Sequence, residues 1–208
     1  MMKSSKMTQG EYAQRIAAEF NGILPYHEIF YIRAIGFAAD RALQTFHRFG
    51  KAIQNDKHSP LVVASLQEAL NHCAAISRFF WPTAKDALAV ARGKTLRQAF
   101  RAADDSPLRS RAIRNHVEHF DERLDRFLSN DPMGQLCDFV VGSSELVNEQ
   151  ATHVMLLVDP EAQIVVLFGE KYDFSGLTDC VGAVHAAAYA MDTNGGRLNP
   201  KDQPSQPT

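Results

Sequence analysis

Cysteine pairs, long apolar stretches and nucleotide-binding glycine motifs are all missing from this 208-residue chain. The three cysteines, Cys73, Cys137 and Cys180, lie far apart without a CxxC pair, so we expect small buried hydrophobic residues in a reducing compartment. No stretch of 18 apolar residues exists, and the N-terminal MMKSSKMTQG lacks the apolar core of a signal peptide. These absences predict a cytoplasmic protein with no membrane partner.

The overall charge of the chain is close to neutral, with a formal value of −2. No global positive field draws nucleic acid to such a protein, so any RNA contact has to come from a local patch of cations. Apolar residues make up 45% of the chain and charged residues 22%, as is typical of a globular domain. We expect one domain over residues 1–192, followed by a disordered tail over 193–208.

Apolar residues that recur every three or four positions predict long helices in the first half of the chain. Thr8 and Glu11 have the spacing of a capping box at the start of a first helix, and Ser59 with Pro60 begins a third. The second helix carries a one-sided apolar stripe: Tyr31, Ile35, Ala39, Ala42, Phe46, Phe49 and Ile53. The third helix carries a similar stripe: Val62, Leu66, Ala69, Cys73, Ile76 and Phe80.

Further helices are expected over residues 83–103, interrupted near Gly93, and from about Pro107 to Leu128. The period then changes, because two β-branched apolar runs joined by a short proline-containing link predict a β-hairpin at about residues 153–170. Residues 176–192 return to an alanine-rich helix. The predicted fold is mainly α, a bundle of five or six helices with a β-hairpin inserted before the last helix.

The charge-rich stretch RNHVEHFDERLD (114–125) divides into two faces when it is drawn as a helix. One face is apolar and is expected to pack in the core: Ile113, Val117, Phe120, Leu124, Phe127 and Leu128. The other face carries Arg114, Asn115 and His119 together with glutamates, whereas His116 lies on the shoulder of the apolar face. The polar face is therefore the candidate functional surface of this segment.

Two interpretations of this polar face stay open. Arg114 and Glu118 are opposite charges four residues apart, as expected of a solvated helix face. The same face also offers an arginine that can clamp a phosphate and a histidine that can transfer a proton near neutral pH, with Asn115 able to orient either one. A second copy of His119 across a two-fold axis would let two histidines divide the acid and base roles of metal-free RNA cleavage.

This segment resembles the motif of the HEPN superfamily, small helical bundles found in RNases, toxins and defence systems. The family pattern is an Arg followed by a polar residue, often Asn, and a His after four to six intervening residues, and Arg114, Asn115 and His119 match it. The resemblance implies a homodimeric endoribonuclease that needs no metal or cofactor, with Arg114 and His119 as the catalytic pair and Asn115 in support. An antidote protein is a possible partner. Asp121 stands where some members carry a modified Tyr, so that form of regulation is not expected.

A basic stretch lies just before and within the motif segment, with seven Arg and Lys residues between Arg92 and Arg114. It is either a local RNA-binding patch or a set of cations that balances the acidic residues at 118–125. The candidate RNA-binding residues are Arg97, Arg101, Arg109 and Arg111.

Other chemistry finds less support in the sequence. His116 and His119 are three residues apart, unlike HExxH, and with His72 as a possible third ligand the set falls short of a zinc site, so we expect no metal. No GxSxG or P-loop motif occurs. The alternative function is a non-catalytic helical bundle that binds a partner protein or RNA.

Overall fold

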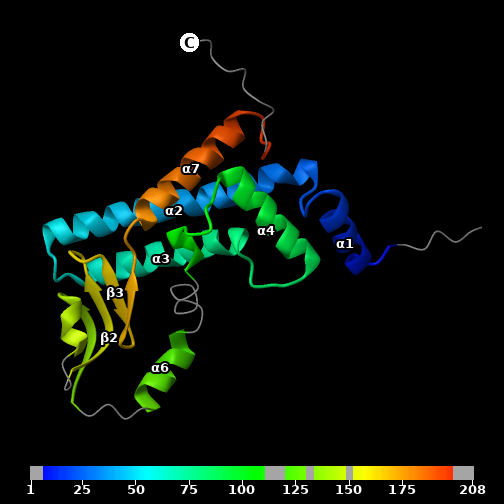
Figure 1. The fold of residues 1–208 in the computed structure, drawn as a ribbon. Helices are drawn as coiled ribbons and strands as arrows, with labels where there is room; N and C mark the ends of the chain where they lie inside the picture. Colours follow the sequence, from blue (N-terminus) through cyan, green and yellow to red (C-terminus); the bar gives the residue numbers. More distant parts are fainter. Residues whose placement is uncertain (1–6, 111–119, 130–133, 149–151, 199–208) are drawn as a thin grey trace, which may run out of the picture.

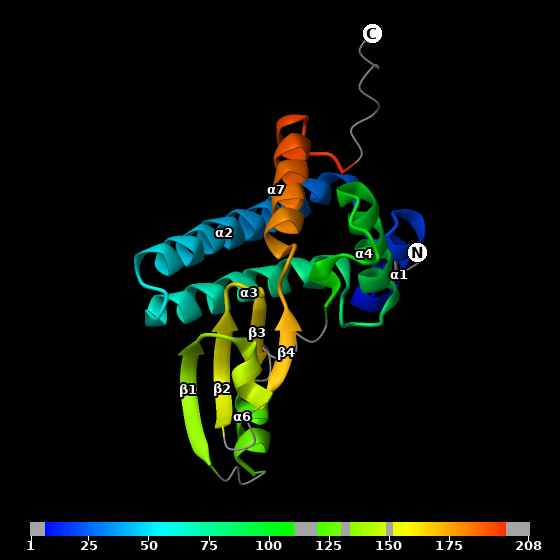
Figure 2. The ribbon, with the colours of Figure 1, turned by 60° about the vertical axis from the view of Figure 1, so that its left-hand side comes forward.

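The long helices and the sheet are stacked, with α7 (Leu177–Thr193) at one end of the stack and the sheet at the other (Figure 1). The computed structural model describes residues 7–110, 120–129, 134–148 and 152–198. Helix α2 (Glu28–Asn55) lies between α7 and α3 (Pro60–Phe80), and the sheet packs against α3 (Figures 1 and 2). The expected mainly α fold is thereby confirmed, with the predicted hairpin forming part of a four-stranded sheet.

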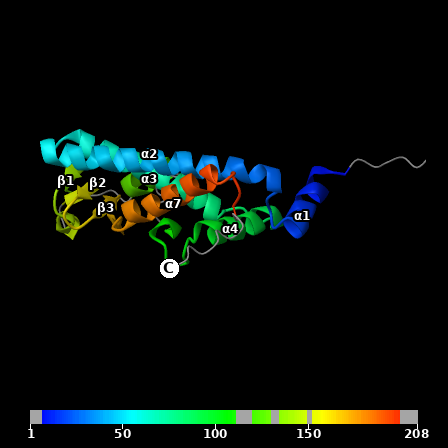
Figure 3. The same ribbon diagram turned by 90° about the horizontal axis from the view of Figure 1, so that it is seen from above.

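Helix α1 (Gln9–Glu19) begins with the predicted capping box. The Thr8 N–H donates to Glu11 Oε2 at 2.8 Å, and the Glu11 N–H donates to Thr8 Oγ1 at 3.3 Å. These reciprocal bonds satisfy donors that the first turn leaves without helical partners. The helix packs against α4 (Ala87–Phe100), and Figure 3 shows α1 and the sheet at opposite ends of the long helices.

The apolar stripes of the second and third predicted helices form the contact between α2 and α3. Every stripe residue of α3 is buried, and on α2 only Tyr31 and Ile53 at the two ends of the stripe remain half-buried. Ser59 caps α3, since its Oγ accepts the N–H of Leu61 at 3.3 Å. The three-to-four spacing therefore identified the buried faces correctly.

Helix α4 runs without a break through Gly93, where the sequence led us to expect an interruption. The glycine serves close packing instead, because an added Cβ would lie 2.7 Å from Cδ of Pro82 and 2.9 Å from the carbonyl oxygen of Phe80. The helix ends at Arg101, which adopts the left-handed conformation with φ of 54°.

The helix expected from Pro107 to Leu128 is not continuous from its start. Pro107–Arg109 forms a short 3-10 helix, η2, and Ser110 is outside any helix. Ser106 caps this turn, because its Oγ accepts the N–H of Leu108 at 3.3 Å. The described chain resumes as α6 (Phe120–Ser129), which matches the second half of the prediction.

The sheet has the strand order β1-β2-β3-β4. Its strands are β1 (Gln135–Val141), β2 (Thr152–Asp159), β3 (Ile164–Leu167) and β4 (Glu170–Asp173). β1 and β2 are parallel neighbours and the other two pairs are antiparallel. The connection between β1 and β2 contains a short 3-10 helix, η3 (Ser144–Asn148).

The predicted hairpin corresponds to β2 and β3, which pair in the register Leu157 with Val166. A second, tighter hairpin joins β3 to β4 through Phe168 and Gly169, and both residues have positive φ, at 52° and 82°. Two successive positive φ values suit the twist of a two-residue hairpin, although Phe is an uncommon residue at such a position.

Residues 194–198 follow α7 and return to the start of α2. The Leu198 N–H donates to Glu28 Oε2 at 2.9 Å, Arg197 Nε lies 2.8 Å from the same oxygen, and the Leu198 side chain is buried. The structure thus differs from the expected tail at residues 193–198, because the apolar Leu198 gives this segment a packing contact. Residues 199–208 lie outside the described chain.

One hydrophobic core runs through the helices and into the sheet. It contains stripe residues of α2 and α3 together with sheet residues such as Leu156 and Val165, and the rings of Phe49 and Phe174 meet at 5.9 Å. The opposite face of the sheet has a smaller core around Leu157, covered in part by η3. None of the described helices has the length and apolar character needed to cross a bilayer.

Candidate functional site

The predicted catalytic residues Arg114, Asn115 and His119, and the RNA-binding candidate Arg111, lie outside the described residues. Helix α6 begins at Phe120, the residue that follows His119 in the chain. The structure therefore bears on the candidate site through the residues on either side of the motif: η2 before it and α6 after it.

Helix α6 is anchored to the β3–β4 turn by aromatic contacts. The ring of Phe168 lies 4.9 Å from the ring of Phe120 and 5.6 Å from that of Phe127. Such tilted ring pairs contribute about 0.5–1.5 kcal/mol each beyond the burial of their area. The chain that follows the motif is consequently fixed at both ends of α6 to one turn of the sheet.

A polar contact supports this aromatic anchor. Arg123 Nη1 lies 3.4 Å from Oε2 of Glu170, and the hydroxyl of Tyr172 donates to the same carboxylate oxygen. Burial, together with the bond to Glu170, raises the pKa of Tyr172 well above its ordinary value, so this hydroxyl remains a donor. The three side chains join α6 to β4.

The two faces of α6 agree with the helical wheel in part. Phe120, Leu124 and Phe127 are half-buried, while Asp121 and Glu122 are exposed. Leu128, which the wheel assigned to the apolar face, is 50% exposed, because α6 ends one residue later and no described element covers it. The exposed side of α6 is largely acidic.

The basic stretch does not form one continuous patch among the described residues. Arg97 is half-buried, donates through Nη1 to the carbonyl oxygen of Phe80 and lies over the ring of Trp81 at 6.0 Å. Arg92 lies over the ring of Tyr31 at 6.0 Å. These two arginines connect α4 to neighbouring helices, so their guanidinium groups already have partners within the fold.

Arg101 and Arg109 are more accessible. Both side chains are exposed, but Nη1 of Arg109 donates to the carbonyl oxygen of Asp104 at 2.7 Å and lies 3.7 Å from its carboxylate. Arg101 stands at the end of α4. Of the predicted RNA-binding residues that the structure describes, these two can reach a ligand without leaving a buried contact.

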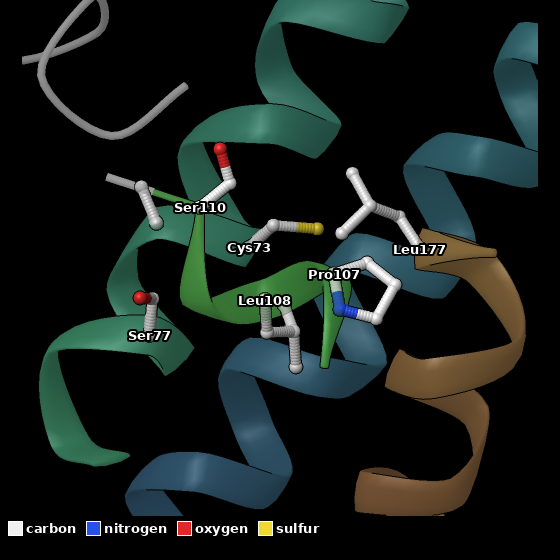
Figure 4. A pocket seen from close by; sticks show the side chains of 7 residues that line it. Cys73, Ser77, Pro107, Leu108, Ser110 and Leu177 are labelled. Carbon is white, nitrogen blue, oxygen red and sulfur yellow. The ribbon is translucent and has the colours of Figure 1, made fainter. Parts of the chain in front are cut away.

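A small cavity lies between α3, η2 and α7, with Cys73 and Ser77 on its wall (Figure 4). Its volume of about 10 Å³ matches a single water molecule, and Ser77 Oγ is buried without a hydrogen-bond partner among the described residues. Burial raises the pKa of Cys73 to about 12, so the thiol stays protonated at neutral pH. Cys73 is the buried hydrophobic residue that the sequence predicted.

The remaining two cysteines, Cys137 and Cys180, are half-buried and free, and Cys180 Sγ lies 3.1 Å from Oγ of Ser106. His72, considered as a possible metal ligand, lies 3.9 Å from a carboxylate oxygen of Glu68, one turn earlier on α3. Within the described ranges, no three His, Cys, Asp or Glu side chains gather as a metal site.

An exposed aromatic surface on α2, α7 and the short 3-10 helix η1 (Pro25–His27) was not among the sequence predictions. Its residues Tyr26, Phe30, Phe37 and Tyr189 are each between 66% and 69% exposed. Phe37 and Tyr189 line one shallow hollow of about 180 Å³, where Gly36 of α2 comes close to Ala188 of α7. The seven-residue spacing of the two phenylalanines, away from the buried stripe, is a signal in the sequence that points to it.

The charges on this aromatic surface are neutralised in pairs. Three arginines each lie within 3.1 Å of a carboxylate oxygen: Arg33 with Asp192, Arg41 with Asp40, and Arg197 with Glu28. A surface of exposed aromatics and paired arginines has the composition of a protein interface more than that of a nucleic-acid groove.

Comparisons of this chain with protein-family models, with curated proteins and with solved structures found no match.

Proposed function

We propose that this chain is a HEPN-like, metal-independent endoribonuclease that acts as a homodimer, with Arg114 and His119 as its catalytic pair and Asn115 in support. The observation that carries the proposal is the Arg-Asn-x3-His pattern directly before α6 in a mainly helical bundle. A role in defence and an antidote protein as partner belong to the same proposal.

The chemistry needs two proton transfers and one charge clamp. One His119 imidazole removes the proton of a ribose 2′-hydroxyl, and the oxygen attacks the adjacent phosphorus. The bond from phosphorus to the 5′-oxygen breaks, and a second His119, from the other copy, protonates that leaving oxygen. Arg114 stabilises the negative charge that gathers on the phosphoryl oxygens. The products are a 2′,3′-cyclic phosphate and a 5′-hydroxyl.

The described residues support this proposal by what they do on either side of the motif. Phe120 and Phe127 fix α6 on Phe168, so the chain after His119 has a defined position on the sheet. Catalysis by oriented side chains requires such a rigid support. On the other side of the motif, Arg101 and Arg109 are exposed cations that can contact RNA phosphates.

Product analysis tests this chemistry. The proposal predicts cleavage of single-stranded RNA in the presence of EDTA, with 2′,3′-cyclic phosphate ends. Loss of cleavage when the metal is chelated, or products with a 3′-hydroxyl, would contradict it. RNA in which the ribose 2′-hydroxyls are methylated serves as the matched control, because it removes the nucleophile and should resist cleavage.

A second candidate function is a non-catalytic interaction protein, and the aromatic surface on α2 and α7 favours it. This candidate assigns a second copy of the chain to that surface, because Arg33, Arg41 and Arg197 each pair with a carboxylate among the described residues, so a two-fold copy would not bring these arginines together unpaired. Exposed aromatics such as Phe37 would supply the apolar centre of the interface.

The two candidates place the two-fold axis differently. Helix α6 lies on the opposite side of the α2–α3 pair from α7 (Figures 1 and 2). A dimer joined through α2 and α7 would therefore hold its two α6 helices far apart, whereas a composite catalytic site needs the two motif segments together. Phe37→Glu should dissociate a dimer that is joined through α2 and α7. Leu128→Glu should dissociate a dimer whose interface involves α6. Size-exclusion chromatography with light scattering distinguishes the two.

A further inference from the structure

A pocket that the proposed ribonuclease activity does not use lies between the α2–α3 connection, the end of β1 and the β2–β3 turn. The pocket has a volume of about 340 Å³, within the range of small-molecule sites. It lies where the parallel strands β1 and β2 end, the edge at which ligands bind in many sheets with parallel strands. Its wall is formed by Ile53, Lys57, His58, Val141, Gly142, Ser143, Asp159, Pro160, Glu161 and Ala162.

Asp159 holds two walls of this pocket in place. Its carboxylate is buried and accepts the N–H of Ser144 at 2.7 Å and the N–H of Ala162 at 3.0 Å. One bond fixes the chain that leaves β1, and the other fixes the turn between β2 and β3. The pocket is therefore built by a rigid hydrogen-bonded corner rather than by a loose surface loop.

The third wall is the connection between α2 and α3. Asp56 Oδ1 accepts the N–H of His58 at 3.0 Å, and the Ser59 N–H donates to the Asp56 carbonyl oxygen at 3.0 Å. These bonds give the connection a fixed turn. Lys57 and His58 thus have defined backbone positions on the side of the pocket that faces the β2–β3 turn.

The pocket carries two opposite charges that do not pair. Lys57 comes from the α2–α3 connection and Glu161 from the β2–β3 turn, and neither forms an ion pair with any described residue. Nearby charged residues of the sheet differ in this respect, since Lys171 lies 3.0 Å from a carboxylate oxygen of Glu145. A ligand that carries a cation and an anion can satisfy both free charges at once.

Between these charges the lining is mainly apolar, from Ile53, Val141, Pro160 and Ala162. Lys57 and Glu161 are both exposed, so a ligand with one charge gains one charge-assisted contact there, whereas a zwitterion gains two. A purely polar ligand would not cover the apolar lining. From this arrangement we infer that the pocket binds a small zwitterion with an apolar side chain, of the class of the aliphatic α-amino acids. The ligand carboxylate contacts Lys57 and His58, and its ammonium group contacts Glu161.

L-Leucine is the probe that tests this site. In a titration of the isotope-labelled protein followed by NMR, the backbone amides of Gly142, Ser143 and Ala162 should shift. The two single-charge analogues, 4-methylpentanoate and isopentylamine, should each bind at least about tenfold more weakly than leucine, since each loses one charge-assisted contact. Equal binding of leucine and either analogue, or no shift of these amides at the highest soluble leucine concentration, would overturn the inference.

Variants locate the binding within the pocket. Lys57→Ala and Glu161→Gln should each weaken leucine binding about tenfold. Lys51→Ala is the matched control, because Lys51 is an exposed lysine of α2 that does not line the pocket. An equal loss in the control, or unchanged affinity in either pocket variant, contradicts the assignment. RNA cleavage by the same variants is measured separately, so failure of either proposal leaves the other standing.

Discussion

Asp159 at the end of β2 accepts the backbone N–H of Ser144 at 2.7 Å, across the connection that follows β1. Burial by itself raises the pKa of this carboxyl, but hydrogen bonds from the Ala162 and Ser144 backbones outweigh it and hold the pKa below its ordinary value. One buried carboxylate thereby joins the two parallel strands at the edge where the pocket lies.

Replacement of Asp159 by Asn should destabilise the fold by about 1–3 kcal/mol, because the amide group cannot accept both backbone N–H groups. Since the folded pKa is depressed, the contribution of the wild-type carboxylate is complete above the unfolded pKa of about 3.9 and is lost as pH falls through the folded pKa. The difference in unfolding free energy between wild type and variant should therefore become smaller as the pH falls below the unfolded pKa of about 3.9. Urea unfolding at a series of pH values measures it, and a gap independent of pH would refute the role of the charge.

Removal of the Phe168 ring should release α6 from the sheet. Phe168 is half-buried, so Phe168→Ala should cost less than the ~3–5 kcal/mol of a fully buried phenylalanine. Hydrogen exchange should become faster in the amides of Phe120–Ser129 while those of α3 stay protected. Phe37→Ala, at an exposed phenylalanine, is the control and should leave exchange in α6 unchanged. Unaltered exchange in the Phe168 variant would mean that other contacts hold α6.

Gly93 should tolerate no side chain, although it lies within a regular helix. Gly93→Ala brings a Cβ against Pro82 and the Phe80 carbonyl, and the overpacking should cost about 1–3 kcal/mol. Gly50→Ala in α2 is the opposite case, because nothing lies within 4 Å of its added Cβ and the change should stabilise the helix by about 0.5–1 kcal/mol. Thermal unfolding of both variants tests the pair, and a shift of the same sign in both would contradict this reading of Gly93.

The long helices were predictable because their signals are local. The capping pair Thr8 and Glu11, the Ser59–Pro60 start and the two apolar stripes each depend on residues a few positions apart, and the structure confirms them. The β2–β3 hairpin was predictable for the same reason, since both strands are apolar runs joined by a short turn.

The rest of the sheet depends on contacts that local patterns do not carry. β1 pairs in parallel with β2 through a connection of about ten residues, and its exposed Leu136 and Phe139 break the expected alternation. β4 follows a turn in which Phe168 takes a positive φ, without the Asn-Gly pair that marks such turns. Gly93 suggested a break because the sequence alone does not distinguish a glycine required for close packing from one that ends a helix.

The candidate sites divide in the same way. The Arg114–Asn115–His119 pattern is visible in the sequence, but its residues lie outside the described chain. The pocket with Lys57 and Glu161, and the aromatic surface with Phe37 and Tyr189, arise only when distant segments come together. Lys57 and Glu161 are about 100 residues apart in the sequence, and Phe37 and Tyr189 about 150, so the only local signal for either site is the seven-residue spacing of Phe30 and Phe37.

RNA cleavage by the wild type and by His119→Ala is the measurement that tests the central proposal most directly, with His116→Ala as the matched control. The proposal predicts that the His119 variant loses cleavage by a factor of about 10² or more while it keeps the circular dichroism spectrum and dimerisation of the wild type. The His116 variant should retain most of the activity. Equal cleavage by wild type and His119→Ala, or no cleavage of any RNA by the wild type, would contradict the proposal and leave the interaction function as the better account.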